Sequence, residues 1–370
     1  MNRIDSHSIQ LLVDLISTQS VSGNESNAVR TFVDRAERLG LDASIDEAGN
    51  GLALRNATGV ETRRIVLLGH IDTVPGELAV EVIDGVLHGR GAVDAKGPLA
   101  AFLMAASNLT VPDGVAIEVI AAVGEETADS PGAHFIRERR APAACIIGEP
   151  SGWDGVTIGY KGRLLVKAGF RKEWSHTAGA DPSAADTLHA WWSSVLNAID
   201  ELQPDSPTTH LFNRVQTTIQ SSITSNDGLI ESAAMTSGFR LPLEISPAQL
   251  ESIIRSLTPP TIALRFIGST EAYKTKRSDP VVRSLSAAIR AEGGTPHPKL
   301  KTGTADFNVV GPAWDCPIAA YGPGDSALDH TPQERIDLAE YQRSIRILTR
   351  AIESLAEELT AHEPQISRSV

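Results

Sequence analysis

Three short apolar runs, each followed directly by a polar cluster, constrain this chain most. Residues 64–68 lead into Gly69-His70, residues 115–123 into Gly124-Glu125-Glu126, and residues 144–147 into Gly148-Glu149-Pro150. Such runs are typical of buried strands, and residues 99–106 and 132–139 between them have the pattern of helices. Strands that alternate with helices predict a mostly parallel sheet covered on both faces. Because ligands bind beyond the carboxyl ends of such strands, the three clusters are predicted to share one site.

The pattern changes near residue 160. Strands are expected at 164–170, 215–224, 233–243 and 261–267, with helices at 184–202 and 246–257, which gives the βαββαβ order of a ferredoxin-like unit. Helices are also expected within 5–39, at 280–292 and at 337–359. A chain of 370 residues is long enough for two domains. We therefore predict a three-layer α/β domain built from 1–159 and 272–370, interrupted by an α+β domain over 160–271.

Composition excludes several classes of protein. A formal net charge of −13 disfavours binding to nucleic acid, since phosphate backbones repel an acidic surface. No uncharged apolar run approaches the length of a membrane span, and the first residues contain no apolar segment of the signal-peptide type. The two cysteines, Cys145 and Cys316, are too few for a disulfide framework. We expect a cytoplasmic protein that binds neither membrane nor nucleic acid.

The polar clusters supply the residue types of a dinuclear metal site. Such a site needs imidazole and carboxylate ligands, one bridging anion, and a further carboxylate that removes a proton from water. On extended backbone, His70 and Asp72 point the same way, so Asp72 can hold the imidazole from behind. The adjacent Glu125 and Glu126 diverge, so that one can bind metal while the other faces the water. The remaining candidates are Asp94 in a glycine-rich loop, Glu149 and His330.

Each of these residues has a simpler alternative when taken alone. A histidine before a turn is commonly structural, and a Glu-Glu pair is commonly a solvated surface feature. The segment GRGAVD (residues 89–94) also resembles a dinucleotide-binding loop, but it lacks the third glycine. The joint position of the candidates at predicted strand ends favours the metal site.

Seven motifs, in this order, resemble those of the dizinc aminoacylase–carboxypeptidase family: HIDTVPG, GRGAVDAKG, GEET, GEPSGW, SHTAG, TGTAD and DHTP. The family includes acetylornithine deacetylase and succinyl-diaminopimelate desuccinylase. The resemblance implies two zinc ions per subunit, with cobalt as a possible substitute. It also implies that the inserted domain is a lid used for dimerisation, and hence a homodimer.

The resemblance assigns a role to each candidate by its position. His70 and Glu149 would hold one zinc ion, Glu126 and His330 the other, and Asp94 would bridge the two. Asp72 would orient His70, and Glu125 would be the general base. No GxSxG or HExxH motif is present to support a serine hydrolase or a single-zinc protease.

Four further residues match positions in the lid and near the substrate. His176 matches a histidine that stabilises the oxyanion, in dimeric relatives from the partner subunit; the alternative is an ordinary surface histidine. Arg240, Gly303 and Thr304 match positions that hold the substrate carboxylate, a task suited to the planar fork of arginine. A surface salt bridge is the alternative for Arg240.

Within the family, GEPSGWDGVTIGYKGR and AYGPGDSALDHTP most resemble a lysine-biosynthesis branch. Those enzymes release lysine, or ornithine for arginine biosynthesis, from the γ-glutamyl terminus of an acidic amino-group carrier protein. The chain departs from that branch at Ala305, where a serine is usual. The alternatives are a small-molecule N-acyl-amino-acid deacylase, a dipeptidase or carboxypeptidase, and a non-catalytic binding relative. Basic residues would attract an acidic carrier that docks on the enzyme. The candidates are Lys161, Arg163, Lys167, Arg171 and Lys172. The alternative is that these residues form only a solvated strand face.

Overall fold

The chain forms two compact units. The computed structural model describes residues 6–55, 63–204 and 210–361. The larger unit comprises residues 1–159, 275–300 and 305–370, and the smaller one comprises residues 160–274 and 301–304. Each unit has a hydrophobic core of its own. The insertion therefore buries its apolar residues within itself.

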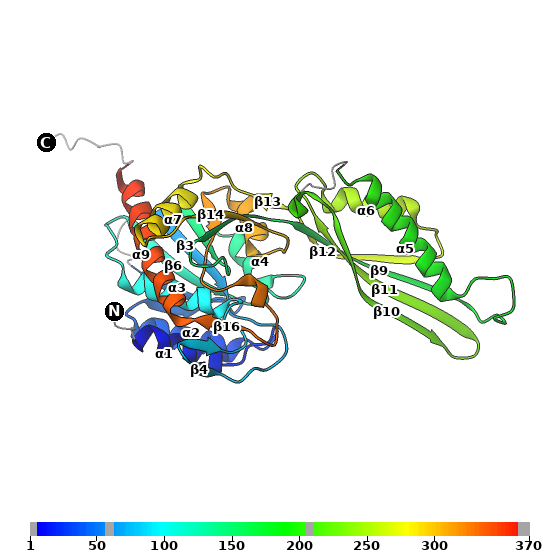
Figure 1. The fold of residues 1–370 in the computed structure, drawn as a ribbon, viewed down its shortest axis with the longest axis horizontal. Helices are drawn as coiled ribbons and strands as arrows, with labels where there is room; N and C mark the ends of the chain where they lie inside the picture. Colours follow the sequence, from blue (N-terminus) through cyan, green and yellow to red (C-terminus); the bar gives the residue numbers. More distant parts are fainter. Residues whose placement is uncertain (1–5, 56–62, 205–209, 362–370) are drawn as a thin grey trace. The chain divides into compact units, whose positions relative to one another are not determined.

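The larger unit combines strands and helices, which alternate along the chain from β5 to β7 (Figure 1). The strands are β1 (Asp42–Ile45), β2 (Gly51–Arg55), β3 (Arg63–His70), β4 (Glu81–Ile83), β5 (Val86–His88), β6 (Val115–Ala122), β7 (Ala144–Gly148), β8 (Gly155–Tyr160), β14 (His297–Lys301), β15 (Ile318–Ala320) and β16 (Arg335–Asp337). The helices are α1 (Ser6–Ser17), α2 (Ser26–Arg38), α3 (Lys96–Asn108), α4 (Pro131–Arg137), α7 (Pro280–Ala291), α8 (Asp306–Trp314), α9 (Leu338–Ala361) and the 3₁₀ turn η2 (Ser326–Leu328).

The main sheet of this unit has the order β1-β2-β6-β3-β7-β15-β8, with β14 beside β8. Its central strands β6, β3, β7 and β15 are parallel, whereas β2 and β8 join antiparallel. Every residue of β6 and β7 is buried, which requires cover on both faces of the sheet. The predicted three-layer α/β class is thus confirmed. The antiparallel strands β1, at the edge of the sheet, and β2, beside it, fall in a segment for which the sequence predicted no element.

The smaller unit has the predicted βαββαβ order. It consists of β9 (Gly162–Glu173), α5 (Ala184–Glu201), the turn η1 (Leu211–Asn213), β10 (Gln216–Asn226), β11 (Ile230–Leu241), α6 (Pro247–Leu257), β12 (Ala263–Thr270) and β13 (Tyr273–Lys274). Its antiparallel sheet has the order β10-β11-β9-β12, as in ferredoxin-like folds. Leu164, Val166 and Ala168 of β9 are buried at alternate positions and belong to the same apolar core as Leu188 and Trp192 of α5. The helices therefore cover one face of this sheet.

None of the helices in the described part of the chain combines the length and apolar character needed to span a bilayer.

Candidate metal centre

The carboxyl ends of three neighbouring parallel strands gather the polar clusters. Strand β3 lies between β6 and β7, and the register pairs His70 with Ala122 and Gly69 with Gly148. The residues that follow β6 and β7 are Glu125, Glu126 and Glu149. Strands that end level with one another hold these side chains at one edge of the sheet, as the alternation of strands and helices predicted.

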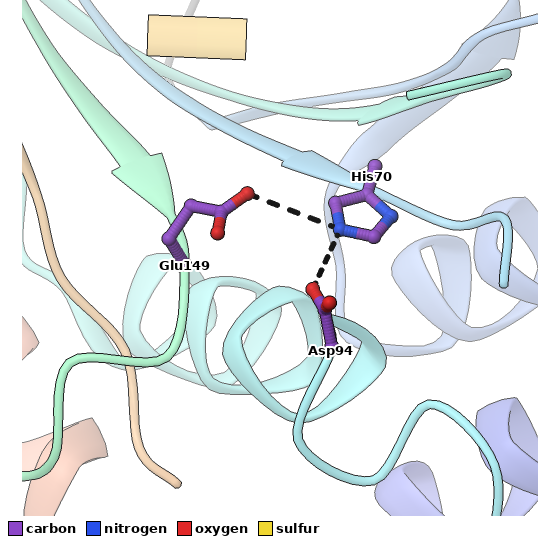
Figure 2. Close-up of side chains that lie close together, drawn as sticks. All are labelled: His70, Asp94 and Glu149. Atoms are coloured by element: carbon purple, nitrogen blue, oxygen red, sulfur yellow. Dashed lines mark hydrogen bonds and ion pairs between the residues drawn. The ribbon is translucent and has the colours of Figure 1, made fainter. Parts of the chain in front are cut away.

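His70 lies between two carboxylates (Figure 2). Its Nε2 is 3.1 Å from Asp94 Oδ1 and 3.9 Å from Glu149 Oε1. The His70 side chain is 2 % exposed, so the ring is fixed by packing as well as by these contacts. One nitrogen and two carboxylate groups thus converge on a single point.

A second group shares Asp94 with the first. Nε2 of His330 is 2.9 Å from Asp94 Oδ2 and 2.9 Å from Glu126 Oε1. The two Asp94 oxygens therefore face different imidazoles, which is the geometry required of a bridging carboxylate. His330 has a φ of 60°, a left-handed conformation that is uncommon for residues with a Cβ and is concentrated at functional sites.

Asp72 organises the residues around it. It is fully buried, and Nδ1 of His70 donates to its carbonyl oxygen at 3.1 Å and lies 3.5 Å from its Oδ1. The carboxylate of Asp72 also accepts from the backbone amides of Glu125 and Glu126, at 3.0 and 3.1 Å. Ser22 Oγ donates to Asp72 Oδ2 at 2.7 Å. One buried carboxylate therefore fixes both the ring of His70 and the backbone of the two glutamates.

The charges of the centre shift its pKa values in opposite directions. Hydrogen bonds that the His330 ring donates to the carboxylates of Asp94 and Glu126 raise the pKa of His330 to about 10. Burial alone would raise the pKa of Asp94, but hydrogen bonds from His330 and His70 hold it below its usual range. In the absence of metal, the positive charge of the protonated histidine rings therefore offsets the negative charge of the carboxylates around them. A divalent cation at either group would take the place of those protons.

Glu125 differs from the other acids of the centre. It belongs to neither of the two groups of converging ligand atoms found among the described residues. Burial, and then the negative charges of Glu149, Asp306 and Glu126, raise its pKa well above the ordinary value, although His70 acts in the opposite direction. A raised pKa makes the carboxylate of Glu125 a stronger proton acceptor than an ordinary glutamate, which suits it to taking up a proton and passing it on.

The two groups fit divalent metal ions. His70, Asp94 and Glu149 form one, and Asp94, Glu126 and His330 form the other, with the ligand atoms of each within 4.8 Å of one another. Imidazole and carboxylate are ligands that zinc accepts, and a contact from Asp72 to the second nitrogen of His70 is the usual support for a metal-bound histidine.

The loop that carries Asp94 is held by residues that the sequence did not single out. Glu334 Oε1 accepts from the backbone amides of Val93 and Asp94, at 3.0 and 3.2 Å. Its other oxygen accepts from Arg90 Nη1 at 2.6 Å, and Arg90 Nη1 also donates to the carbonyl of Thr331 at 3.3 Å. Arg90 and Glu334 are part of the segments around GRGAVD and DHTP, but they are 244 residues apart and nothing in the sequence indicates that they pair.

The remaining predicted residues belong to the smaller unit. Arg240 Nη1 donates to Thr304 Oγ1 at 2.9 Å, so the fold of that unit brings these two together. Gly303 precedes Thr304, and apart from Gly303 and its two chain neighbours no residue has an atom within 4 Å of the point where a Cβ of residue 303 would be. His176 is exposed in the segment after β9, where its Nδ1 accepts from the amide of Ala178 at 3.1 Å.

Comparisons with known proteins add to this geometry. The model of the peptidase family M20/M25/M40 matches residues 66–354. A protein of Deinococcus radiodurans named [LysW]-lysine hydrolase is 44% identical over 352 residues, which cover 94% of this chain and 96% of the relative. A putative [LysW]-lysine/[LysW]-ornithine hydrolase of Thermococcus kodakarensis is 39% identical, with 96% of this chain and 94% of the relative covered.

Solved structures share the fold at low sequence identity. An M20 family metallo-carboxypeptidase of Sulfolobus solfataricus has a TM-score of 0.79 at 15% identity, covering 96% of this chain and 100% of that one. A dinuclear metal-binding peptidase of the M20 family from Bacillus subtilis has a TM-score of 0.68 at 13% identity, covering 96% of this chain and 99% of that one.

Proposed function

Because this chain belongs to the peptidase family M20/M25/M40, a family of metal-dependent hydrolases that cleave amide bonds, we propose a specific bond for it. The bond joins the α-amino group of lysine, or of ornithine, to the γ-carboxyl of the terminal glutamate of an amino-group carrier protein. The names of the relatives in Deinococcus and Thermococcus support this substrate. The observation that carries the hydrolytic chemistry is Asp94, shared between His70 and His330 with Glu125 outside both ligand groups.

The proposed metal content is two zinc ions per subunit, for which cobalt can substitute. His70 and Glu149 would hold one ion, Glu126 and His330 the other, and Asp94 both. The support is the pair of ligand groups with one shared carboxylate. When bound, the ions supply Lewis acidity, which lowers the pKa of water and polarises the carbonyl group of the substrate.

The residues of the chain perform the proton transfers. Glu125 takes a proton from the attacking water and delivers it to the leaving nitrogen, a role supported by its burial and raised pKa. Asp72 keeps the ring of His70 in position and fixes the backbone of Glu125 through its amide. The neighbouring amide of Glu126 also donates to Asp72. These hydrogen bonds fix the backbone of both glutamates, so that Glu125 can act as the base while Glu126 acts as a ligand.

The smaller unit supplies the substrate contacts in this proposal. Residues 160–271 form the lid and dimerisation domain, and residues 1–159 and 272–370 form the catalytic domain. Arg240, Gly303 and Thr304 bind the substrate carboxylate, supported by the hydrogen bond between Arg240 and Thr304. His176 stabilises the oxyanion, a contribution typically of about 3 kcal/mol for one donor.

We also propose a cytoplasmic homodimer. Strand β10 is an edge strand of the smaller unit's sheet, and its segment QTTIQSSITSN contains no charged residue and no proline. Edge strands commonly carry charges or proline that block pairing with another chain. The unprotected edge of β10 therefore supports pairing with the same strand of a second copy.

The experiment that tests the substrate compares carrier-linked lysine, carrier-linked ornithine and N-acetyl-ornithine with the zinc-loaded protein. Release of the free amino acid is measured by chromatography. We expect kcat/KM for a carrier-linked substrate to exceed that for N-acetyl-ornithine by at least an order of magnitude. A preference for N-acetyl-ornithine would overturn the carrier assignment and favour the small-molecule deacylase instead.

A further inference from the structure

The sheet of the smaller unit has one face covered by helices and one open face. Leu164, Val166 and Ala168 of β9 lie on the covered face and are buried. The intervening residues of β9, with odd numbers from 163 to 173, therefore point to the open face. Their cross-strand partners on β11 and β12 point the same way.

Basic residues are concentrated on this open face. They are Arg163, Lys167 and Arg171 of β9, Arg240 of β11 and Arg265 of β12, which together we call the basic face. Within the four strands of this sheet, all of which the structure describes, Glu173 at the far end of β9 is the one acidic residue on the same face. This excess of positive charge occurs in a chain with a net charge of −13.

Two pairs of like charge lie directly opposite each other in the sheet. Arg163 is the cross-strand partner of Arg240, and Lys167 is the partner of Arg265. Side chains at such positions have Cβ atoms about 5 Å apart, and like charges there destabilise a sheet. Lys167 and Arg265 are both exposed, and neither forms an ion pair with any residue that the structure describes. A bound anion would offset this repulsion.

Several residues between the cations have small side chains or none. Gly169, Ala234 and Gly238 lie on the same face as the basic residues, and apart from Gly169 and its two chain neighbours no residue has an atom within 4 Å of the point where a Cβ of Gly169 would be. Residues 163 to 171 span roughly 26 Å at about 3.3 Å per residue. That length accommodates an extended peptide of about eight residues.

The other basic candidates from the sequence have different contacts. Lys161 is fully buried, and its Nζ donates to the carbonyl of Leu211 at 3.1 Å and to Gln216 Oε1 at 3.0 Å. Lys172 lies on the covered face, where its Nζ is 3.6 Å from Glu231 Oε1. The contacts of these two lysines are with residues of the smaller unit itself, and neither lysine is part of the basic face.

We propose that the basic face docks an acidic segment of the carrier polypeptide. This inference rests on the proposed function and adds a binding site for the part of the substrate beyond the scissile bond. Carboxylate side chains along an extended segment would contact the Arg163–Arg240 pair and, further along the strands, the Lys167–Arg265 pair. A single-stranded nucleic acid fits less well, because the basic face carries no aromatic residue on which bases could stack.

The test uses two substrates that differ only in length. The first is the dipeptide γ-glutamyl-lysine, and the second is a synthetic peptide with four glutamates before the same γ-glutamyl-lysine terminus. The variant carries Lys167→Glu and Arg265→Glu. We expect its KM for the acidic peptide to rise at least 10-fold, while kcat and all constants for the dipeptide stay within twofold of wild type. The matched control, Arg30→Glu with Lys276→Glu, reverses two exposed charges on the larger unit and is expected to change neither substrate.

Binding is measured separately, by calorimetry with an uncleavable acidic peptide that ends in free glutamate. We expect the double variant to weaken this binding at least 10-fold, and added salt to weaken it in the wild type. An unchanged dissociation constant would overturn the proposal, as would tighter binding of a 12-residue oligothymidylate than of the peptide. Absence of hydrolysis of either substrate by the wild type would contradict the proposed function instead, and the binding result would still decide the docking surface.

Discussion

Glu334 holds the backbone of Asp94: its Oε1 accepts from the Asp94 amide at 3.2 Å and from the neighbouring Val93 amide at 3.0 Å. The other oxygen of Glu334 accepts from Arg90. Glu334 lies four residues after His330, so one side chain connects the loop of the shared carboxylate to the segment of a candidate ligand.

The first prediction concerns this connection. Glu334→Gln removes the charge that pairs with Arg90 and is expected to weaken metal affinity by about 10- to 100-fold, as for other residues that support a ligand. Competition with a chromogenic chelator measures the affinity, and the absorption spectrum of the cobalt-loaded protein reports on the ligand geometry. Arg90→Lys, which retains the charge, is expected to fall between the variant and wild type. The prediction would be contradicted if Glu334→Gln bound metal as tightly as the wild type and its cobalt-loaded form had the same absorption spectrum.

Two adjacent glutamates are predicted to respond differently. Glu125→Gln is expected to retain both metal ions and to lower kcat by about 10²- to 10⁴-fold, because the proton acceptor is lost. Glu126→Gln is expected to lose metal, because its carboxylate contacts His330 in the second ligand group. Metal analysis by mass spectrometry and steady-state kinetics separate the two outcomes. Near-normal turnover by Glu125→Gln would exclude it as the base.

Asp306 is predicted to make the metal-free protein sensitive to pH. It is 2 % exposed, its Oδ1 has no hydrogen-bond partner among the described residues, and burial raises its pKa to about 7 from 3.8. The folded protein therefore keeps this proton at pH values where the unfolded chain has lost it. Its contribution to the free energy of unfolding is complete below pH 3.8 and is lost as the pH rises through about 7.

Asp306→Asn is accordingly expected to stabilise the metal-free protein at pH 8 and to have little effect at pH 4. The difference is on the order of 1.4 kcal/mol for each pKa unit. Urea unfolding at both pH values measures it. If the two proteins had parallel stability profiles across this range, the carboxyl of Asp306 would not be the titrating group.

Ala305, where the lysine-biosynthesis branch usually has serine, is the N-cap residue of α8. Its φ of −146° and ψ of 176° suit a capping side chain, but alanine has none to offer. Ala305→Ser is therefore expected to raise the free energy of unfolding by about 1 kcal/mol. Since the hydroxyl would serve the helix, we expect the ratio of kcat/KM for carrier-linked lysine and ornithine to stay unchanged. A changed ratio would indicate a substrate contact at this position.

The dimer prediction is tested at β10. Ile223 is 65 % exposed on this strand, and Ile223→Lys places a charge on the edge. Light scattering is expected to show a dimer for the wild type and a monomer for the variant. A dimeric variant would exclude pairing through β10.

The origin of the proposed oxyanion donor is tested by mixing subunits. If His176 acts in the partner's site, a heterodimer of Glu125→Gln and His176→Ala subunits contains one complete site and recovers activity. Each homodimer alone is expected to be nearly inactive. Lack of recovery in a demonstrated heterodimer would place His176 in the site of its own subunit or outside catalysis.

Much of the fold followed from local patterns. The alternating apolar runs predicted the central strands β3, β6 and β7, and the ordered motifs predicted a family that the comparisons confirm. Strands β1 and β2 were not predicted, because they are short and only Gly51 and Ala53 among their residues are buried, so neither forms an apolar run. The short β15 was also missed, since its three residues are too few for a periodic pattern.

The sequence by itself determined which chemistry is available: imidazoles and carboxylates after buried strands, and a family pattern that assigns each a role. Only the tertiary structure decided that Asp94 contacts two histidines 260 residues apart, that Glu334 holds its loop, and that five cations share one face of a sheet. The physical reason is that local periodicity shows which way a side chain points within its own element. Which elements become neighbours depends on strand order and register, and these are set by burial across the whole chain.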